Sequence, residues 1–402
     1  MLERETREIV KSTVPVLAEH GETITRRFYA RMFAAHPELK NVFNQAHQAA
    51  GEQPQALARA VMAWAEHIDE PQVLEDSVRR IAHKHVSLRV TEDQYAIVGE
   101  HLLGAMGEVL GDAATPEIVG AWEQAYWELA RILIDAEKGL YQEQAAQQGG
   151  WTDWRPFRIR RKVPESAEII SFELVPEDGG AIPQHRPGQY VSVRLDLPDE
   201  GIRQPRQYSL THAPGHDALR ISVKRERGNG APDGRVSGRL HEELGEGDRL
   251  EVSAPAGDFV LEPGEHPLVL MAGGVGITPL LSMLHELDRA GMPRPVTLVH
   301  AVRNQEVRAF TTEVDAVRAR YPERLRVAVF VEDGDVRGES EYSGRLDPAR
   351  LPGELLPGDA EVRLSGPLPF IRDQRQRLQD AGLSTDRVFH EVFGPDVLAD
   401  AG

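Results

Sequence analysis

The spacing of the hydrophobic residues changes twice along the chain. Up to about residue 143, apolar positions recur every three or four residues, which predicts amphipathic helices. From residue 151 to about 259 they form short runs rich in β-branched residues and bounded by Pro or Gly, which favours an antiparallel β-barrel. From residue 267 onward strand-like and helix-like runs alternate, so we expect an α/β unit with a parallel doubly wound sheet. Its strand-like runs are 268–271, 296–300, 326–331, 362–364 and 388–390.

These changes predict a multidomain chain. The stretch 141–150 (YQEQAAQQGG) is polar and ends in two glycines, which indicates a helix tail followed by a linker. We therefore expect an all-α domain at 1–148, the barrel domain at 151–262 and the α/β domain at 265–397. A chain of 402 residues is long enough for each of these domains to bury a core of its own.

Composition narrows the chemistry. The formal net charge of −18 disfavours nucleic acid as a partner, because phosphate backbones repel an acidic protein. The chain contains 0 Cys, which excludes disulfides, zinc–thiolate sites, iron–sulfur clusters and cysteine nucleophiles. Any iron must then be held by His, Tyr, Met or carboxylate side chains. The charged N-terminus and the lack of a run of about 18 apolar residues predict a cytoplasmic protein with no membrane span.

One histidine lies on the apolar face of a predicted helix. His85 shares helical spacing with Leu74, Val78, Ile81 and Leu88, and therefore shares their face. A histidine in such a place is most often a hydrogen-bonded core residue, and a metal ligand is the alternative.

Two further polar residues lie on inner helix faces. Thr91 and Gln94 form a capping-box pattern, and the helix that follows directs Tyr95 inward. Glu137 lies on the apolar stripe of the last helix, although it could also be an edge residue that reaches solvent. Together with His85 they predict one polar network. A Tyr and a Glu bonded to the free nitrogen of a metal-bound His raise its basicity, which at iron favours O–O activation over reversible O₂ binding.

The barrel carries residue types that suit a flavin nucleotide. In the string 206–209 (RQYS), Arg206 suits a pyrophosphate, Tyr208 a flavin ring and Ser209 the flavin N5. An ordinary strand with a surface arginine is the alternative. Gly234 leads into a helix with Ser237 near its start, which predicts a second contact to a pyrophosphate.

A glycine-rich turn follows the first strand of the α/β unit. The apolar run ends in Gly273, Gly274 and Gly276, and Thr278 and Pro279 suit the N-cap and the first helical position. Backbone N–H groups at such a helix start face the pyrophosphate of a dinucleotide. Pro279 replaces the third glycine of GxGxxG, so this is not the usual Rossmann fingerprint.

Several of these strings resemble one family. Residues 28–33 (FYARMF), 83–85 (HKH), 94–103 (QYAIVGEHLL) and the helix of Glu137 resemble, in order and spacing, the globin domain of flavohemoglobins. Residues 186–190 (RPGQY) and 206–210 (RQYSL) resemble the FAD barrel of ferredoxin-reductase-type proteins, and 268–279 resembles their NAD(P) domain. The resemblance covers residues 1 to about 397.

The resemblance implies roles for residues of the helical domain. His85 is implied to be the proximal ligand of a heme, with Tyr95 and Glu137 as its hydrogen-bonded support. Lys84 matches a family position thought to tune electron transfer between flavin and heme. Tyr29 is implied to donate a hydrogen bond to bound O₂. The residues implied to line the distal side are Tyr29, Gln53 and Leu57, with Phe43 packed on the porphyrin.

The resemblance also implies roles in the rest of the chain. Phe393 is implied to cover the flavin ring and to move aside for the nicotinamide, and Glu391 to influence the flavin and heme potentials. Ser365 and Val392 stand where the family often has Cys. The implied FAD contacts are Tyr190, Arg206, Gln207, Tyr208, Ser209, Gly234 and Ser237. The implied dinucleotide and C-terminal contacts are Gly273, Gly274, Val275, Gly276, Ile277, Thr278, Pro279, Val392, Phe393, Gly394 and Pro395.

The implied activity is nitric oxide dioxygenation, which converts NO and O₂ to nitrate with heme b, FAD and NADH or NADPH. Two alternatives remain open at this point: an NAD(P)H oxidase or ferric or dye reductase, and an O₂- or NO-binding sensor globin. Arg303 follows a predicted strand and suits either a 2′-phosphate or a surface position, so the choice between NADH and NADPH is also open. We expect a monomer that binds only small molecules.

Overall fold

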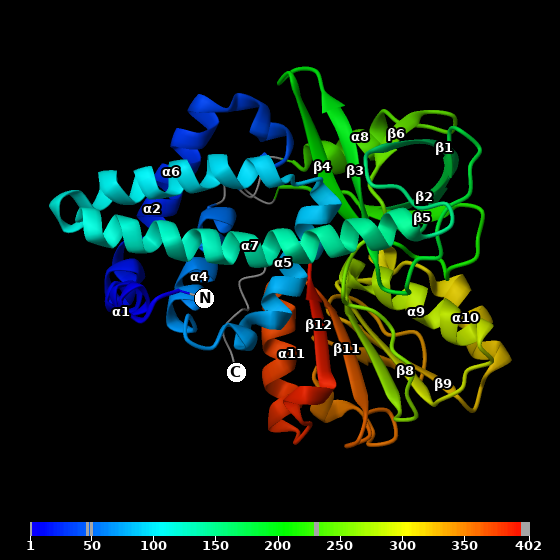
Figure 1. Ribbon diagram of the computed structural model, residues 1–402. Helices are drawn as coiled ribbons and strands as arrows, with labels where there is room; N and C mark the ends of the chain where they lie inside the picture. Colours follow the sequence, from blue (N-terminus) through cyan, green and yellow to red (C-terminus); the bar gives the residue numbers. More distant parts are fainter. Residues whose placement is uncertain (1, 46–47, 49–50, 229–232, 395–402) are drawn as a thin grey trace.

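The computed structural model describes residues 2–45, 48, 51–228 and 233–394. The chain forms a helical region, an antiparallel barrel and a parallel sheet, in the predicted order (Figure 1). The helices of the first region are α1 (Arg4–Ser12), α2 (Val14–Ala35), α4 (Glu52–Glu66), α5 (Glu75–Leu88), α6 (Glu92–Leu110) and α7 (Pro116–Ala146). Short 3₁₀ turns join them: η1 (Pro37–Asn41), η2 (Pro71–Leu74) and η3 (Gly111–Ala113).

The inner faces of these helices bury the apolar positions that the periodicity indicated. Phe28, Met32 and Trp122 are among the buried core residues. The predicted capping box is present at the start of α6, where the backbone N–H of Thr91 donates to the side chain of Gln94 at 3.2 Å. Leu74 was expected on the helix of His85, but it lies in η2, because α5 begins one residue later at Glu75.

The barrel follows the α7 helix. Its elements are β1 (Arg155–Pro164), β2 (Ile169–Pro176), β3 (Tyr190–Leu197), β4 (Ile202–Ser209), β5 (Leu219–Lys224), α8 (Arg235–Glu242) and β6 (Arg249–Val252). The strands pair antiparallel in the order β4-β3-β6-β1-β2-β5. A bridge between Leu210 and Ile221 joins the two outer strands, which closes the sheet around buried residues such as Phe157 and Phe172.

The last region is an all-parallel sheet in the order β10-β9-β8-β7-β11-β12. Alternate residues of β7 face opposite sides, so that Leu270 packs in the core with α9 and α10, and Met271 in the core with α11. The short strand β10 was not predicted. The elements are β7 (Leu268–Gly273), η4 (Gly274–Gly276), α9 (Ile277–Arg289), β8 (Val296–Val302), α10 (Thr311–Arg320), β9 (Leu325–Val331), β10 (Glu341–Ser343), β11 (Glu361–Gly366), α11 (Leu368–Asp380) and β12 (Val388–Val392).

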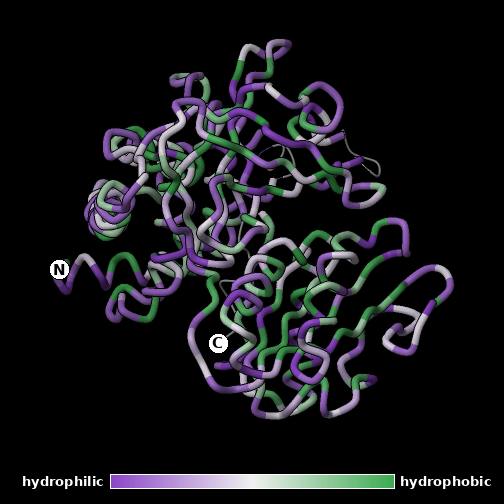
Figure 2. Tube along the Cα trace, turned by 90° about the vertical axis from the view of Figure 1, so that its right-hand side faces the viewer, coloured by the Kyte–Doolittle hydropathy of each residue, from purple (hydrophilic) through white to green (hydrophobic). Residues whose placement is uncertain are grey.

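Hydropathy along the chain agrees with these layers. In Figure 2 the hydrophobic stretches run through the interior, notably along the strands of the parallel sheet, and hydrophilic stretches follow the outer loops and helix faces. Within the ranges that the structure describes, none of the helices combines the length and the apolar character that crossing a membrane would need.

The helical region contacts the barrel at two places that later position the site. The helix α5 contacts β3, and η1 contacts β4. At the second place the side chain of Gln204 donates to the carbonyl of Lys40 at 2.7 Å, and the backbone N–H of Arg203 donates to Asn41 at 2.7 Å. The outer strands β3 and β4, which carry the flavin strings, are therefore held against the helices.

Gly188, in the turn before β3, provides a test of the barrel geometry. Its φ is +105°, and a Cβ added there would lie 2.1 Å from the carbonyl oxygen of Phe259. We expect Gly188→Ala to lower the free energy of unfolding by about 2–4 kcal/mol, from strain and overpacking together. Thermal unfolding followed by circular dichroism measures the change.

Gly179→Ala is the matched control, because Gly179 also has a positive φ, +66°, but has open space around its Cβ position. It should cost only about 1–2 kcal/mol. Equal losses in the two variants would contradict the proposed steric contact at Gly188.

Candidate functional site

The predicted His–Tyr–Glu network is present in the helical region. Nδ1 of His85 lies 2.7 Å from Oε1 of Glu137 and 3.0 Å from the hydroxyl of Tyr95. The Tyr95 hydroxyl donates to the same carboxylate oxygen at 2.5 Å. Because a carboxylate only accepts hydrogen bonds, Nδ1 of His85 must carry hydrogen, and the lone pair of the neutral ring is then on Nε2. The ring therefore presents Nε2 as a metal ligand.

Burial controls the charges of this network. Glu137 is only 3% exposed, and its carboxylate is compensated by the two hydrogen bonds that it accepts. Burial, and then the charge of Glu137, raise the pKa of Tyr95, so that its phenol stays protonated and continues to donate. The alternative position for Glu137, at a solvent-reaching edge, is excluded by its burial.

Tyr29 lies on α2 inside an aromatic cluster. Its ring centroid is 5.8 Å from that of Phe33 and 5.6 Å from that of Phe43. Burial raises the pKa of Tyr29, which keeps its hydroxyl protonated as a hydrogen-bond donor. On α4, the amide oxygen Oε1 of Gln53 is buried and has no partner among the side chains that the structure describes.

These features fit the heme that the resemblance implies. The free Nε2 of His85 supplies an iron ligand, and the orphaned oxygen of Gln53 indicates that a polar ligand is missing from its surroundings. Leu57 and Phe43 pack against the core but remain only partly buried. Apolar side chains of this kind suit the faces of a large flat macrocycle.

The barrel contains a partly buried arginine that lacks a carboxylate partner among the described residues. Arg206 lies on β4, and its guanidinium donates to the carbonyl of Pro205 at 2.7 Å and to Gln204 at 3.3 Å. No carboxylate pairs with it in the described part of the chain, and burial lowers its pKa. A partly buried cation is stabilised by a counter-ion, so this position fits a pyrophosphate such as that of FAD.

Other predicted flavin residues lie on β3 and β4 or at the start of α8. Burial raises the pKa of Tyr208 and of Tyr190, so both phenols are neutral, and Ser209 is buried at the end of β4. Gly234 is the N-cap of α8, as the sequence indicated, and the Ser237 hydroxyl donates to the Gly234 carbonyl at 3.0 Å.

The helix α5, which carries His85, also contacts the barrel. Gln207 of β4 donates to Ser87 at 2.8 Å, and the backbone N–H of Gly257 donates to Nδ1 of His83 at 3.1 Å. Lys84 donates to the carbonyl of Gly394 at 2.5 Å, where β12 ends beside α5 (Figure 1). Local spacing carries no sign of the barrel partner of His83, because that contact joins residues far apart in the chain.

Two predicted residues near the end of β12 differ in exposure. Burial, and then the charge of Asp258, raise the pKa of the Glu391 carboxyl to about 8, whereas Lys84 opposes the shift. Phe393 is 41% exposed, which suits an aromatic ring that covers a planar group. Val392 and Gly394 flank Phe393, and Pro395 lies outside the described residues.

The glycine-rich turn lies between the predicted strand and the predicted helix, but the N-cap of that helix differs from the prediction. The helix α9 begins at Ile277 with Gly276 as N-cap, so the predictions of Thr278 as N-cap and Pro279 as first helical residue are wrong. The reason is that η4 continues directly into α9, and the Thr278 hydroxyl turns back to the carbonyl of Val275 at 3.0 Å.

The glycines of this turn allow close backbone contacts. A Cβ on Gly276 would lie 2.2 Å from the carbonyl oxygen of Ser365, and one on Gly273 would lie 2.7 Å from the ring of Phe370. Around Gly274, whose φ is +55°, the space is open. The hydroxyl of Ser365 is buried without a partner among the described side chains, so it remains available to a bound group.

Arg303 forms an ion pair with Glu168, the residue before β2, at 2.5 Å. Its guanidinium is half exposed and has a carboxylate partner, whereas Arg206 is partly buried and has no carboxylate partner among the described residues.

Two family models match the chain, Globin over residues 26–133 and Oxidoreductase NAD-binding domain over residues 270–376. The flavohemoprotein of Bordetella pertussis is 52% identical over 405 aligned residues, covering 99% of this chain and 100% of that protein. The crystal structure of flavohemoglobin from Malassezia yamatoensis with bound FAD and heme matches with a TM-score of 0.87 and 30% identity, covering 98% of this chain and 100% of that one. The FAD/NAD-binding domain of nitric oxide dioxygenase from Vibrio cholerae O1 biovar El Tor matches 60% of this chain and 100% of its own length, with a TM-score of 0.57 and 36% identity.

The first two of these matches extend from the helical region through the barrel to the parallel sheet, so the likeness is not confined to one part of the chain. With its globin and NAD-binding oxidoreductase regions in the same polypeptide, the protein is a member of the flavohemoprotein family.

Proposed function

We propose that this protein is a nitric oxide dioxygenase, which converts NO and O₂ to nitrate with electrons from NADH or NADPH. The proposal assigns a heme b to His85 in a globin domain at 1–148, FAD to a barrel domain at 151–262, and the dinucleotide to a domain at 265–397. One observation carries it: α5 presents His85 on one side and contacts the flavin strands on the other. A single helix between two redox sites suits electron transfer from one site to the other.

When bound, the heme supplies an iron at which O₂ and NO react, and the flavin converts a hydride into single electrons. The chain's own contribution at the proximal side is electronic. Glu137 holds the hydrogen on Nδ1 of His85, and Tyr95 holds Glu137 in place. This arrangement increases the basicity of Nε2, which favours oxygen activation over reversible oxygen storage.

At the distal side the chain offers one strong hydrogen-bond donor. The hydroxyl of Tyr29 is protonated and buried among aromatic rings that exclude water. We assign Tyr29 the role of holding an oxygen ligand, with Gln53 and Leu57 completing the pocket. In the barrel, Arg206 and the start of α8 bind the flavin pyrophosphate, and the turn 273–279 binds that of the dinucleotide.

Product analysis tests the proposed activity. Purified protein loaded with hemin and FAD is supplied with NADH and NO under air, and nitrate and hydrogen peroxide are measured. A dioxygenase should yield about one nitrate per NO consumed, with little peroxide. Peroxide as the main product would support an NAD(P)H oxidase, and failure to oxidise NAD(P)H with any acceptor would support a sensor globin.

His85→Ala tests the ligand assignment. We expect the variant to purify without stably bound heme, because no other side chain replaces Nε2, and yet to reduce a dye from NAD(P)H through an intact flavin site. Absorption spectra and dye-reduction assays measure the two properties. His20→Ala, which removes an exposed histidine of α2, is the control and should keep the heme. An unaltered heme spectrum in His85→Ala would refute the assignment.

Tyr29→Phe tests the distal donor. Loss of one buried hydrogen bond of about 1.5 kcal/mol should increase the rate of O₂ dissociation about tenfold and lower nitrate formation. Stopped-flow O₂ dissociation and nitrate yield are the measurements. Tyr141→Phe is the matched control, because the Tyr141 hydroxyl donates to the Val90 carbonyl, at 2.9 Å, and its ring is not part of the aromatic cluster of Tyr29. If both rates stay at wild-type values in Tyr29→Phe, Tyr29 does not have the distal role.

A further inference from the structure

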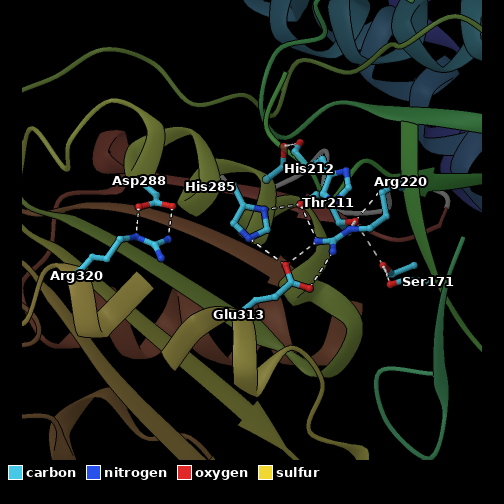
Figure 3. A network of polar contacts seen from close by, with 10 residues as sticks. Ser171, Thr211, His212, Arg220, His285, Asp288, Glu313 and Arg320 are labelled. Atoms are coloured by element: carbon cyan, nitrogen blue, oxygen red, sulfur yellow. Dashed lines mark hydrogen bonds and ion pairs between the residues drawn. The ribbon is translucent and has the colours of Figure 1, made fainter. Parts of the chain in front are cut away.

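A buried polar network joins the parallel-sheet region to the barrel (Figure 3). Arg220 of β5 donates to both carboxylate oxygens of Glu313 on α10, at 2.8 and 2.9 Å, and its side chain is only 8% exposed. The Arg220 guanidinium also donates to the hydroxyl of Thr211, two residues after β4 ends, at 2.7 Å. This is a buried, bidentate ion pair between two structural units, with fixed geometry.

His285 of α9 completes the network. Its Nδ1 lies 3.0 Å from the carbonyl oxygen of Thr211, and its Nε2 lies 3.1 Å from Oε2 of Glu313. The ring of His285 therefore contacts both the residue that follows β4 by two positions and the carboxylate on α10.

Other charged and titratable groups lie close to His285. They are Glu313 on α10, Arg220 on β5, and His212, whose ring centroid is 6.4 Å from that of His285. Burial by itself raises the pKa of Glu313, but hydrogen bonds from His285 and Arg220 outweigh it and lower this pKa to about 2. Burial and the charge of Arg220 lower the pKa of His212 to about 3, so His212 is neutral.

The network joins the ends of the two cofactor-binding elements. Thr211 follows Ser209, the flavin residue at the end of β4, by two positions. His285 lies about two turns along α9 from Ile277, where the dinucleotide-binding turn becomes helix. On the same helix the hydroxyl of Ser282 donates to the carbonyl of His212 at 2.7 Å. The placement of α9 relative to β4 is thus fixed by these contacts.

We propose that His285 is a positioning residue for hydride transfer: its ring, held between Thr211 and Glu313, sets the distance between the dinucleotide on α9 and the flavin on β4. In that step a hydride leaves the nicotinamide and adds to the flavin, which leaves oxidised NAD(P)⁺. The inference rests on the NAD(P)H–flavin half of the proposed function and does not involve NO.

Anaerobic stopped-flow reduction of the flavin by NADH, with the holoenzyme, tests the proposal. The limiting rate at saturating NADH should be about tenfold lower in His285→Gln than in the wild type, because misplacement of reacting groups slows transfer. The dissociation constant for NADH should change little, because the dinucleotide site lies within one region.

Asp288→Asn is the matched control. Asp288 and Arg320 also join α9 to α10, at 2.9 Å, but this pair is not part of the network that reaches the barrel (Figure 3). Its limiting rate should match that of the wild type. A full limiting rate in His285→Gln, or an equal loss in Asp288→Asn, would overturn the proposal.

Glu313→Gln keeps His285 but removes the carboxylate that its ring contacts, so it gives a second readout that does not depend on the folding of the His285 variant. Its limiting rate should also fall, while the dissociation constant for NADH stays unchanged. A full limiting rate in Glu313→Gln would overturn the proposal. Normal flavin reduction combined with absent nitrate formation would instead contradict only the dioxygenase activity.

Discussion

The site depends on one requirement: a carboxylate buried in the helical region must accept hydrogen bonds. Glu137 is almost fully buried, and it accepts from the phenol of Tyr95 and from Nδ1 of His85. Because these bonds fix the hydrogen on Nδ1, they also fix the lone pair on Nε2. The residue that compensates the buried charge is therefore also the residue that the structure prepares as a metal ligand.

The position of α5 connects this requirement to the rest of the chain. His85 faces the interior of the helical region, whereas His83, Lys84 and Ser87 on the same helix contact the barrel and the end of β12. The helix is held from both sides, so displacement of the barrel would also displace His85. The helical region and the barrel thus share α5 as a common element, and the contacts of α5 fix the separation between the two regions.

Two arginines of the barrel differ in how their charge is compensated. Arg220 has its carboxylate within the chain, in Glu313, and the pair joins the barrel to the parallel sheet. Arg206 is partly buried and has only neutral oxygen partners among the described residues, which is why we propose that its counter-charge comes from a bound group. The presence or absence of a carboxylate partner thus separates the structural arginine from the proposed ligand-binding one.

The sequence by itself determined the order of helical, barrel and parallel-sheet regions, since hydrophobic spacing reports which face of each element is buried. It also indicated His85, Tyr95 and Glu137, because each lies on an apolar helix face where a polar group needs a partner. Only the tertiary structure decided what those partners are. The contacts of His83 with Gly257 and of His285 with Glu313 join residues from different regions, and local spacing carries no information about such pairs. The N-cap of α9 was mispredicted for a related reason: whether a glycine turn stops or continues into a helix is decided by its packing against β11, which lies far along the chain.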